Sequence, residues 1–266
     1  MKATLIETGP SAYDSFAPYY DAFTAASDYE TWTAQVLELA ARHGWRGHTL
    51  LDLACGTGKS FLPFLRRGFD VTGCDSSSAM LAEAARKAPE AKLVHADVRN
   101  LTMVGRFDLV TCFDDSLNYL LDADNLAAAL HSVAANLAPG GLAVFDLNTL
   151  RAYRTTFARD SVSVRDETMF VWRGECAPGA GPGCRASARI DVFASRDDGL
   201  YERVGTRHEQ RHFPRELVVE RLRRARLECV GVHGVLDSGE LVERPDESTQ
   251  LKVLYIARHV KGGAAQ

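Results

Sequence analysis

Residues 50–60 read Leu50-Leu51-Asp52-Leu53-Ala54-Cys55-Gly56-Thr57-Gly58-Lys59-Ser60, an apolar run that ends in a glycine-rich turn. The amphipathic stretch 61–65 follows and predicts a helix. A buried strand, a turn that lets a ligand reach bare backbone and a helix N-terminus with free N–H groups together form a ligand-binding device. Three classes of ligand use this device, so the spacing of its residues has to decide among them.

Spacing argues against a nucleoside triphosphate. Gly58-Lys59-Ser60 matches the end of a P-loop, but leucine stands at position 53, where the first glycine of that motif belongs. A dinucleotide fits better, because Gly56 and Gly58 match the first two glycines of its motif and Asp75 ends the next apolar run. The third glycine is replaced by Phe61, so this motif alone does not decide.

Asp52, four residues ahead of Gly56, suits a cationic ligand end better than a pyrophosphate. S-adenosylmethionine offers an ammonium group to this carboxylate and a ribose diol to Asp75. With these residues the sequence resembles the class I S-adenosylmethionine-dependent methyltransferases. Four segments match the motifs of that family in order, namely 52–58, 71–81, 96–98 and 136–141.

The resemblance extends to a bacterial branch of small-molecule methyltransferases that carry an inserted antiparallel sheet. The pattern Tyr-Asp-x-Phe-Ala-x-x-Tyr-Asp at 13–21, the loop 113–120 and the segments 200–203 and 211–214 match this branch. Relatives there include sugar-amine and amino-acid N-methyltransferases. The resemblance implies transfer of a methyl group from S-adenosyl-L-methionine to nitrogen or oxygen of a small molecule, in the biosynthesis of a specialised metabolite.

Apolar runs alternate with helical stretches from residue 48 onward, which predicts an α/β fold with a parallel, Rossmann-like sheet covered on both faces. By resemblance this sheet has seven strands. The strands are expected at 48–54, 70–75, 91–95, 107–113, 141–147, 227–234 and 251–258, and the helices at 59–67, 78–87, 124–137 and 214–226, after two N-terminal helices within 11–44.

Short alternating runs separated by turn residues predict a small antiparallel sheet between about 150 and 213. The expected organisation therefore has three parts. Residues 1–149 hold the N-terminal helices and the cofactor-binding core, residues 150–213 an inserted substrate subdomain, and residues 214–266 the last helix and the closing strands of the core.

The resemblance also implies the cofactor contacts. Asp52 would meet the methionine ammonium, Asp75 the ribose, and Asp97 with Val98 the adenine. Met80 either packs on the adenine or belongs to the core. The expected cofactor residues are Tyr20, Trp32, Asp52, Ala54, Gly56, Gly58, Asp75, Ser76, Met80, Asp97, Val98 and Phe113.

Residues 208–212 read His-Glu-x-x-His, the zinc protease pattern, which binds zinc only when it lies on a helix. Gly205 before it and Pro214 after it favour a strand, so no metal is expected. On a strand, residues 208, 210 and 212 share one face, which could form the floor of a substrate pocket together with the polar loop 114–120. The expected substrate residues are Asp115, Asn118, Tyr119, His208, Gln210 and His212.

Methyl transfer is an in-line displacement that needs the nucleophile held at about 3–3.5 Å, and a base where the nucleophile carries a proton. His208 is the preferred base, because imidazole titrates near neutrality; a solvent-facing histidine is the alternative. Tyr13 and Tyr20 lie seven residues apart and share a helix face. The tyrosines would line the methyl channel, or they pack in the core. The catalytic candidates are therefore His208, Tyr13 and Tyr20.

Composition limits the other classes of function. The chain of 266 residues has a formal net charge of −4, which argues against a nucleic-acid partner, and it lacks an apolar run of membrane-spanning length. Its six cysteines form no C-x-x-C pair, which favours a reducing cytoplasm. The inserted sheet could serve as a homodimer interface. Two other functions stay open, a cofactor-binding cyclase or isomerase and a metal-dependent hydrolase that uses the histidines.

Overall fold

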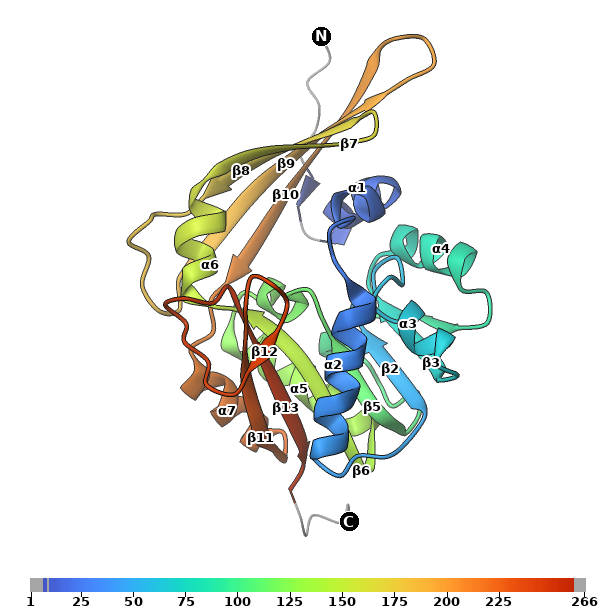
Figure 1. Cartoon of the computed structure of the whole chain (residues 1–266), viewed down its shortest axis with the longest axis vertical. Helices are drawn as coiled ribbons and strands as arrows, with labels where there is room; N and C mark the ends of the chain where they lie inside the picture. The colour runs from blue at the N-terminus through green and yellow to red at the C-terminus, as the bar shows by residue number, and fades with distance from the viewer. Residues whose placement is uncertain (1–6, 9, 261–266) are drawn as a thin grey trace.

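A mixed sheet forms the centre of the molecule (Figure 1). The computed structural model describes residues 7–8 and 10–260. The strands of the central sheet lie in the order β12-β11-β13-β6-β5-β2-β3-β4. They are β2 (Thr49–Leu53), β3 (Asp70–Asp75), β4 (Lys92–His95), β5 (Phe107–Cys112), β6 (Leu137–Asn148), β11 (Leu227–Val235), β12 (Leu241–Val242) and β13 (Lys252–His259).

The seven expected strands are all present, and an eighth, β12, is added at the edge. It has two residues and pairs with β11 through Gly234 and Val235. A strand this short carries no periodic pattern, so the sequence did not predict it. Strand β2 pairs with β3 on one side and β5 on the other. The strand order reverses between β2 and β5. A ligand crevice is expected at the carboxyl ends of strands at such a point.

Helices cover both faces of the central sheet (Figure 1). Because successive side chains on a strand point to opposite faces, Leu50 and Leu51 enter different cores. Leu50 packs in the same cluster as Phe64, and Leu51 in the same cluster as Leu130. The helices are α1 (Pro10–Phe23), α2 (Tyr29–Arg42), α3 (Leu62–Arg66), α4 (Ser78–Lys87), α5 (Ala123–Asn136), α6 (Leu150–Thr155) and α7 (Arg215–Arg224), and the 3₁₀ turns are η1 (Val98–Asn100), η2 (Ser116–Tyr119) and η3 (Thr156–Ala158). Among the described residues, no helix combines the length and apolar character needed to cross a membrane.

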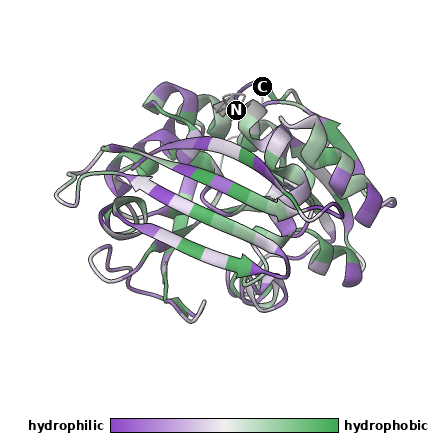
Figure 2. Ribbon diagram, turned by 90° about the horizontal axis from the view of Figure 1, so that it is seen from above, coloured by the Kyte–Doolittle hydropathy of each residue, from purple (hydrophilic) through white to green (hydrophobic). Residues whose placement is uncertain are grey.

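The inserted antiparallel sheet is confirmed. It consists of β7 (Asp160–Arg165), β8 (Thr168–Glu175), β9 (Arg185–Ser195) and β10 (Tyr201–Arg211), and the two-residue β1 (Glu7–Thr8) pairs parallel to β10. Viewed from above, hydrophobic and hydrophilic positions alternate along its strands (Figure 2). One face buries Phe170, Ile190 and Val192 against Phe16 of α1. On β8 to β10, Asp191 pairs with Arg173 and Arg203.

Helix α1 lies between the inserted sheet and the core (Figure 1). Asp14 accepts a hydrogen bond from the Ser77 hydroxyl at 2.5 Å, at the start of α4. Asp21 accepts one from the Thr57 hydroxyl at 2.5 Å and pairs with Lys87 at 2.5 Å. These contacts fix α1 over the glycine turn, and α1 also packs against β10.

Candidate active site

The glycine turn has the backbone geometry that a close ligand approach requires. Gly56 has φ +52° and Gly58 has φ +84°, in the left-handed region that favours glycine. A Cβ on Gly56 would point into open space with only Tyr20 within 4 Å, whereas a Cβ on Gly58 would overlap the Phe61 ring at 2.6 Å. Gly56 therefore leaves room for a ligand, and Gly58 leaves room for the protein's own core.

A cavity of about 620 Å³ opens beside this turn, between α1, β10 and the carboxyl ends of the strands. Its volume falls within the range of small-molecule sites. Of the residues expected from the sequence, those that line it are Tyr13, Tyr20, Ala54, Gly56, Asp75, Ser76, Met80, Asp97, Val98, Tyr119 and His208.

Two carboxylates mark the end of the cavity at β3 and β4. Asp75 accepts hydrogen bonds from the backbone N–H of Gly56 and of Ser77, each at 2.8 Å, and burial raises its pKa. Asp97 accepts a hydrogen bond from the Arg99 N–H at 2.8 Å, and the Arg99 guanidinium lowers the pKa of Asp97. These bonds hold both carboxylates at the cavity wall, and Met80 lines the same end. Acceptors for a ribose diol and an adenine amine are thus available where the nucleoside was expected.

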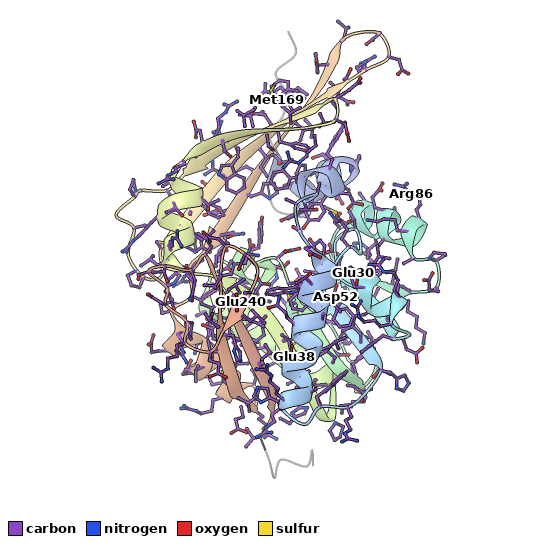
Figure 3. The ribbon with its side chains drawn as sticks, in the orientation of Figure 1. Glu30, Glu38, Asp52, Arg86, Met169 and Glu240 are labelled. Atoms are coloured by element: carbon purple, nitrogen blue, oxygen red, sulfur yellow. The ribbon has the colours of Figure 1, made fainter. Side chains whose placement is uncertain are left out.

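Asp52 does not line the cavity, contrary to the contact expected with the methionine ammonium. Its side chain lies at the centre of the molecule (Figure 3) and is 1% exposed. The Ser60 hydroxyl donates to one carboxylate oxygen at 2.5 Å and the Thr111 hydroxyl to the other at 2.6 Å. Burial raises its pKa to about 7. Both carboxylate oxygens therefore bind groups of the protein itself, and Asp52 stabilises the glycine turn through Ser60 rather than binding a ligand.

Three other expected cofactor residues also lie outside this cavity. Gly58 is covered by the Phe61 ring. Trp32 packs edge-on against Phe113, with ring centroids 5.7 Å apart, and lines a second, smaller cavity. Phe113 is 4% exposed and belongs to the core.

Four of the expected substrate residues join the inserted sheet to the core and do not line the cavity. Asp115 accepts a hydrogen bond from the Gln210 amide at 2.5 Å. The Asn118 amide donates to the Arg211 carbonyl at 2.8 Å. His212 accepts from the Gly183 N–H at 3.1 Å and contacts Glu247. Their polar groups are used in hydrogen bonds within the protein, because buried polar groups require partners.

Aromatic rings gather where α1, η2 and β10 border the cavity. The Tyr13 ring centroid lies 5.0 Å from that of His208, 5.6 Å from that of Tyr119 and 6.3 Å from that of Tyr20. Such a cluster attracts a cation to its faces. Burial raises the pKa of Tyr13, Tyr20 and Tyr119, so these phenols stay protonated at neutral pH.

His208 lies on β10, as the strand prediction requires, and the His-Glu-x-x-His pattern therefore lacks the helix on which zinc binding depends. Its side chain is buried while its neighbour Glu209 is exposed. Its Nδ1 lies 3.2 Å from the Tyr119 hydroxyl and its Nε2 lies 2.9 Å from the Thr206 hydroxyl. Burial lowers the pKa of His208 to about 4.

The low pKa of His208 predicts a loss of stability in acid. The unfolded chain binds a proton at this histidine near pH 6.5, whereas the folded protein does so only near pH 4. Its contribution to stability is therefore complete above pH 6.5 and falls as the pH drops from 6.5 to 4. Between pH 7.5 and pH 5 the wild type should lose about 2 kcal/mol more than His208→Gln. Urea unfolding at the two pH values measures this, and equal losses in both proteins would contradict the assignment.

Several residues that line the cavity are not among the individual residues singled out from the sequence. Asp114 and Ser116 follow β5 and line the cavity, and Asp114 adopts φ +56°, which is uncommon for a residue other than glycine. Arg185 and Arg207 line the cavity from β9 and β10. Asp114 and Ser116 belong to the polar loop 114–120, which was expected to border the substrate pocket. No sequence pattern separates Arg185 and Arg207 from surface arginines.

The comparisons agree with this geometry. The family model described as "Methyltransferase domain" matches residues 50–141. A protein of Geobacillus sp. (strain WCH70) that is named as a methyltransferase is 33% identical over 205 residues, which cover 74% of this chain and 81% of that protein. A crystal structure of a S-adenosylmethionine-dependent methyltransferase from Clostridium acetobutylicum ATCC 824 aligns with TM-score 0.77 and 28% identity, over 93% of this chain and 98% of that one.

A relative that matches part of this chain is named for its reaction. The dTDP-3-amino-3,6-dideoxy-alpha-D-glucopyranose N,N-dimethyltransferase of Streptomyces fradiae is 37% identical over 119 residues, 45% of this chain and 47% of that enzyme. The fold, the glycine turn and the comparisons together define the class. The chain belongs to the S-adenosylmethionine-dependent methyltransferases of class I, with an inserted antiparallel sheet.

Proposed function

We propose that this methyltransferase acts on the nitrogen of an amine in a small molecule. The observation that carries the proposal is the set of groups that line the cavity near the aromatic rings. A carboxylate, Asp114, and the phenols of Tyr13, Tyr20 and Tyr119 lie there, with His208 as the only imidazole among the lining residues. These groups suit a cationic amine, through charge and through aromatic faces.

A hydroxyl acceptor fits this cavity less well. An alcohol must lose its proton as it attacks, which calls for a base with a pKa near the working pH. His208 has a pKa of about 4 and both ring nitrogens within hydrogen-bond distance of hydroxyl groups. An amine needs to lose only its extra proton, to solvent or to a carboxylate such as Asp114, and then attacks as the free base.

The cavity fits the methyl donor of the family, because open space at Gly56 and the Asp75 carboxylate lie on one wall. Bound there, S-adenosylmethionine would supply a methyl group already activated by a positive sulfur. Asp75 would hold the ribose, and Asp97 with Val98 would hold the adenine. The ring cluster would exclude water and orient the acceptor nitrogen, which is most of what an in-line displacement requires.

His208 then has a positioning role. Its contact with the Tyr119 hydroxyl fixes that ring beside Tyr13. His208→Gln should lower kcat roughly ten- to a hundredfold through misplacement, and leave the affinity for the methyl donor unchanged. The shape of the kcat pH profile should be preserved. If His208→Gln instead removes a limb of that profile, the imidazole acts as the base.

The named relatives support an amine, since the Streptomyces fradiae enzyme is named for N,N-dimethylation of an amino sugar linked to dTDP. A test uses pairs of small molecules that differ only in one amino or hydroxyl group, such as amino sugars and the parent sugars. With ¹³C-methyl-labelled donor, we expect label in the amines alone, at the chemical shift of N-methyl carbon. Label in the hydroxyl partners would show O-methylation, and donor binding without any labelled product would favour a cyclase or isomerase role.

A further inference from the structure

The loop of residues 176–184, which joins β8 to β9, begins with Cys176 and ends with Cys184. The two strands are paired as far as Glu175 and Ser187, so both ends of the loop leave the same hairpin. We propose that Cys176 and Cys184 form a reversible disulfide bond when the protein meets a small-molecule disulfide such as glutathione disulfide. The site does not depend on which acceptor the enzyme methylates.

Both thiols lie against the same small group of buried side chains. Cys176 and Cys184 pack on the cluster formed by Tyr153, Phe157, Ala186 and Ala188. Each thiol is close enough to the other to change its pKa, and both raise the pKa of the Tyr153 phenol. The two sulfur atoms therefore lie near one hydroxyl group, at neighbouring ends of one loop. A disulfide between them requires rotation of two side chains and leaves the pairing of the strands in place.

Exposure separates this pair from the other cysteines of the chain. A reagent in solution reaches a thiol only where the thiol is at least partly exposed. Cys176, Cys184 and Cys229 are half-buried, whereas the remaining three cysteines are buried. Cys229 lies on β11 in the central sheet, where its thiol contacts the Gly231 carbonyl at 3.6 Å. Cys176 and Cys184 are thus both open to the reagent and adjacent to each other.

The bond forms by thiol–disulfide exchange. The thiolate of one cysteine attacks a sulfur of glutathione disulfide, which gives a mixed disulfide and releases one glutathione. The thiolate of the second cysteine attacks the protein sulfur of that mixed disulfide and releases the second glutathione. The protein loses two protons and two electrons, which convert the reagent to two molecules of glutathione. Because burial raises the pKa of both thiols, the exchange is slow at neutral pH and faster in mildly alkaline buffer.

The loop is also attached to the rest of the molecule, beside α6 (Figure 1). The Arg154 guanidinium of α6 donates to the Ala180 carbonyl at 2.7 Å. The Gly183 N–H donates to Nδ1 of His212 at 3.1 Å, and the His212 N–H donates to the Cys184 carbonyl at 2.9 Å. A bond across the loop restricts the unfolded chain and keeps these native contacts, so the oxidised protein should resist unfolding better than the reduced one.

The test treats the full chain with glutathione disulfide at about pH 8, after reduction with dithiothreitol. Trypsin cleaves after Arg173 and Arg185, so both cysteines fall in the single peptide 174–185. We expect this peptide to lose about 2 Da on oxidation and to regain that mass with dithiothreitol. Urea unfolding of the intact protein should shift to a higher urea concentration on oxidation and return on reduction.

Serine variants make the assignment specific. Cys176→Ser and Cys184→Ser should each abolish the mass loss and the shift in urea unfolding, and leave a mixed disulfide with glutathione on the remaining cysteine. Cys229→Ser removes the other half-buried thiol and is the matched control, which should behave as the wild type does. Mixed disulfides on both cysteines of the wild-type peptide, or a peptide that keeps its reduced mass, would overturn the proposal. Equal urea unfolding of the oxidised and reduced wild type would overturn the stabilising role of the bond.

Discussion

Asp75→Ala should bind S-adenosylhomocysteine roughly a hundredfold more weakly than the wild type. The carboxylate lines the cavity where the ribose is proposed to lie, and hydrogen bonds to a charged acceptor are worth about 1.5–3 kcal/mol each. The loss of two such bonds amounts to about 3 kcal/mol or more, which is about a factor of 100. Asp75 also accepts from the Gly56 N–H at 2.8 Å, so the turn itself loses an anchor. Calorimetric titration measures the change.

Asp70→Ala is the matched control for this prediction. Asp70 starts the same strand, β3, but its side chain is 81% exposed, and within residues 7–8 and 10–260 its one ion pair is with His48 at 3.7 Å. An exposed pair of this kind contributes little, so affinity and stability should stay close to those of the wild type. Equal binding by Asp75→Ala and the wild type would remove Asp75 from the cofactor site.

The elements of the core could be predicted because their patterns are local. Strand β3 and helix α4 have the bounds expected from the sequence, 70–75 and 78–87. Apolar runs buried on both faces define the parallel strands, and Ser77 caps α4 through the Met80 N–H. The inserted sheet followed from alternation and turns, and β10 joins the alternating run at 200–204 to the segment around His208 that was also expected as a strand.

The candidate site could also be predicted only where the signal is local in sequence. Residues within the family motifs that sit at the end of a strand, such as Gly56, Asp75 and Asp97, line the cavity as expected. Asp52 belongs to the same motif as Gly56, yet it lies inside strand β2, where the hydroxyls of Ser60 and Thr111 donate to both carboxylate oxygens. The type of a residue shows that its polar group needs a hydrogen-bond partner once it is buried. Whether that partner is a ligand or another side chain depends on contacts distant in sequence.

The junction between the two sheets shows this most clearly. Asn118 and Gln210 were expected to bind substrate, but Asn118 holds the Arg211 carbonyl and Gln210 holds Asp115, 95 residues away in sequence. A strand face with polar residues at alternate positions is compatible with a pocket floor and with a buried interface. Only the tertiary structure, which brings β10 onto η2, distinguishes the two.

Asp115 makes the central contacts of this junction, and Asp115→Ala should destabilise the protein by about 2–3 kcal/mol. Its carboxylate pairs with Lys252 at 2.7 Å and accepts from the Gln210 amide at 2.5 Å. Asp115 is partly exposed and Lys252 keeps its contact with Asp146 at 2.9 Å, so the cost is that of the lost hydrogen bonds to a charged group. Asp115 also has φ +51°, a conformation that alanine adopts less readily than aspartate or asparagine.

Asp115→Asn separates these causes, because asparagine tolerates the left-handed backbone and can still accept from Gln210 while the charge is lost. It should cost less than Asp115→Ala, and the difference measures the backbone and hydrogen-bond contributions. Lys252→Met removes the other charge, and the double variant Asp115→Asn/Lys252→Met should be at least about 1 kcal/mol more stable than the sum of the single effects predicts. Urea unfolding at pH 7.5 gives all four values. Additive effects within about 0.5 kcal/mol would show that the Asp115–Lys252 pair does not hold the inserted sheet to the core, and Asp146 would then be the partner that keeps Lys252 in place.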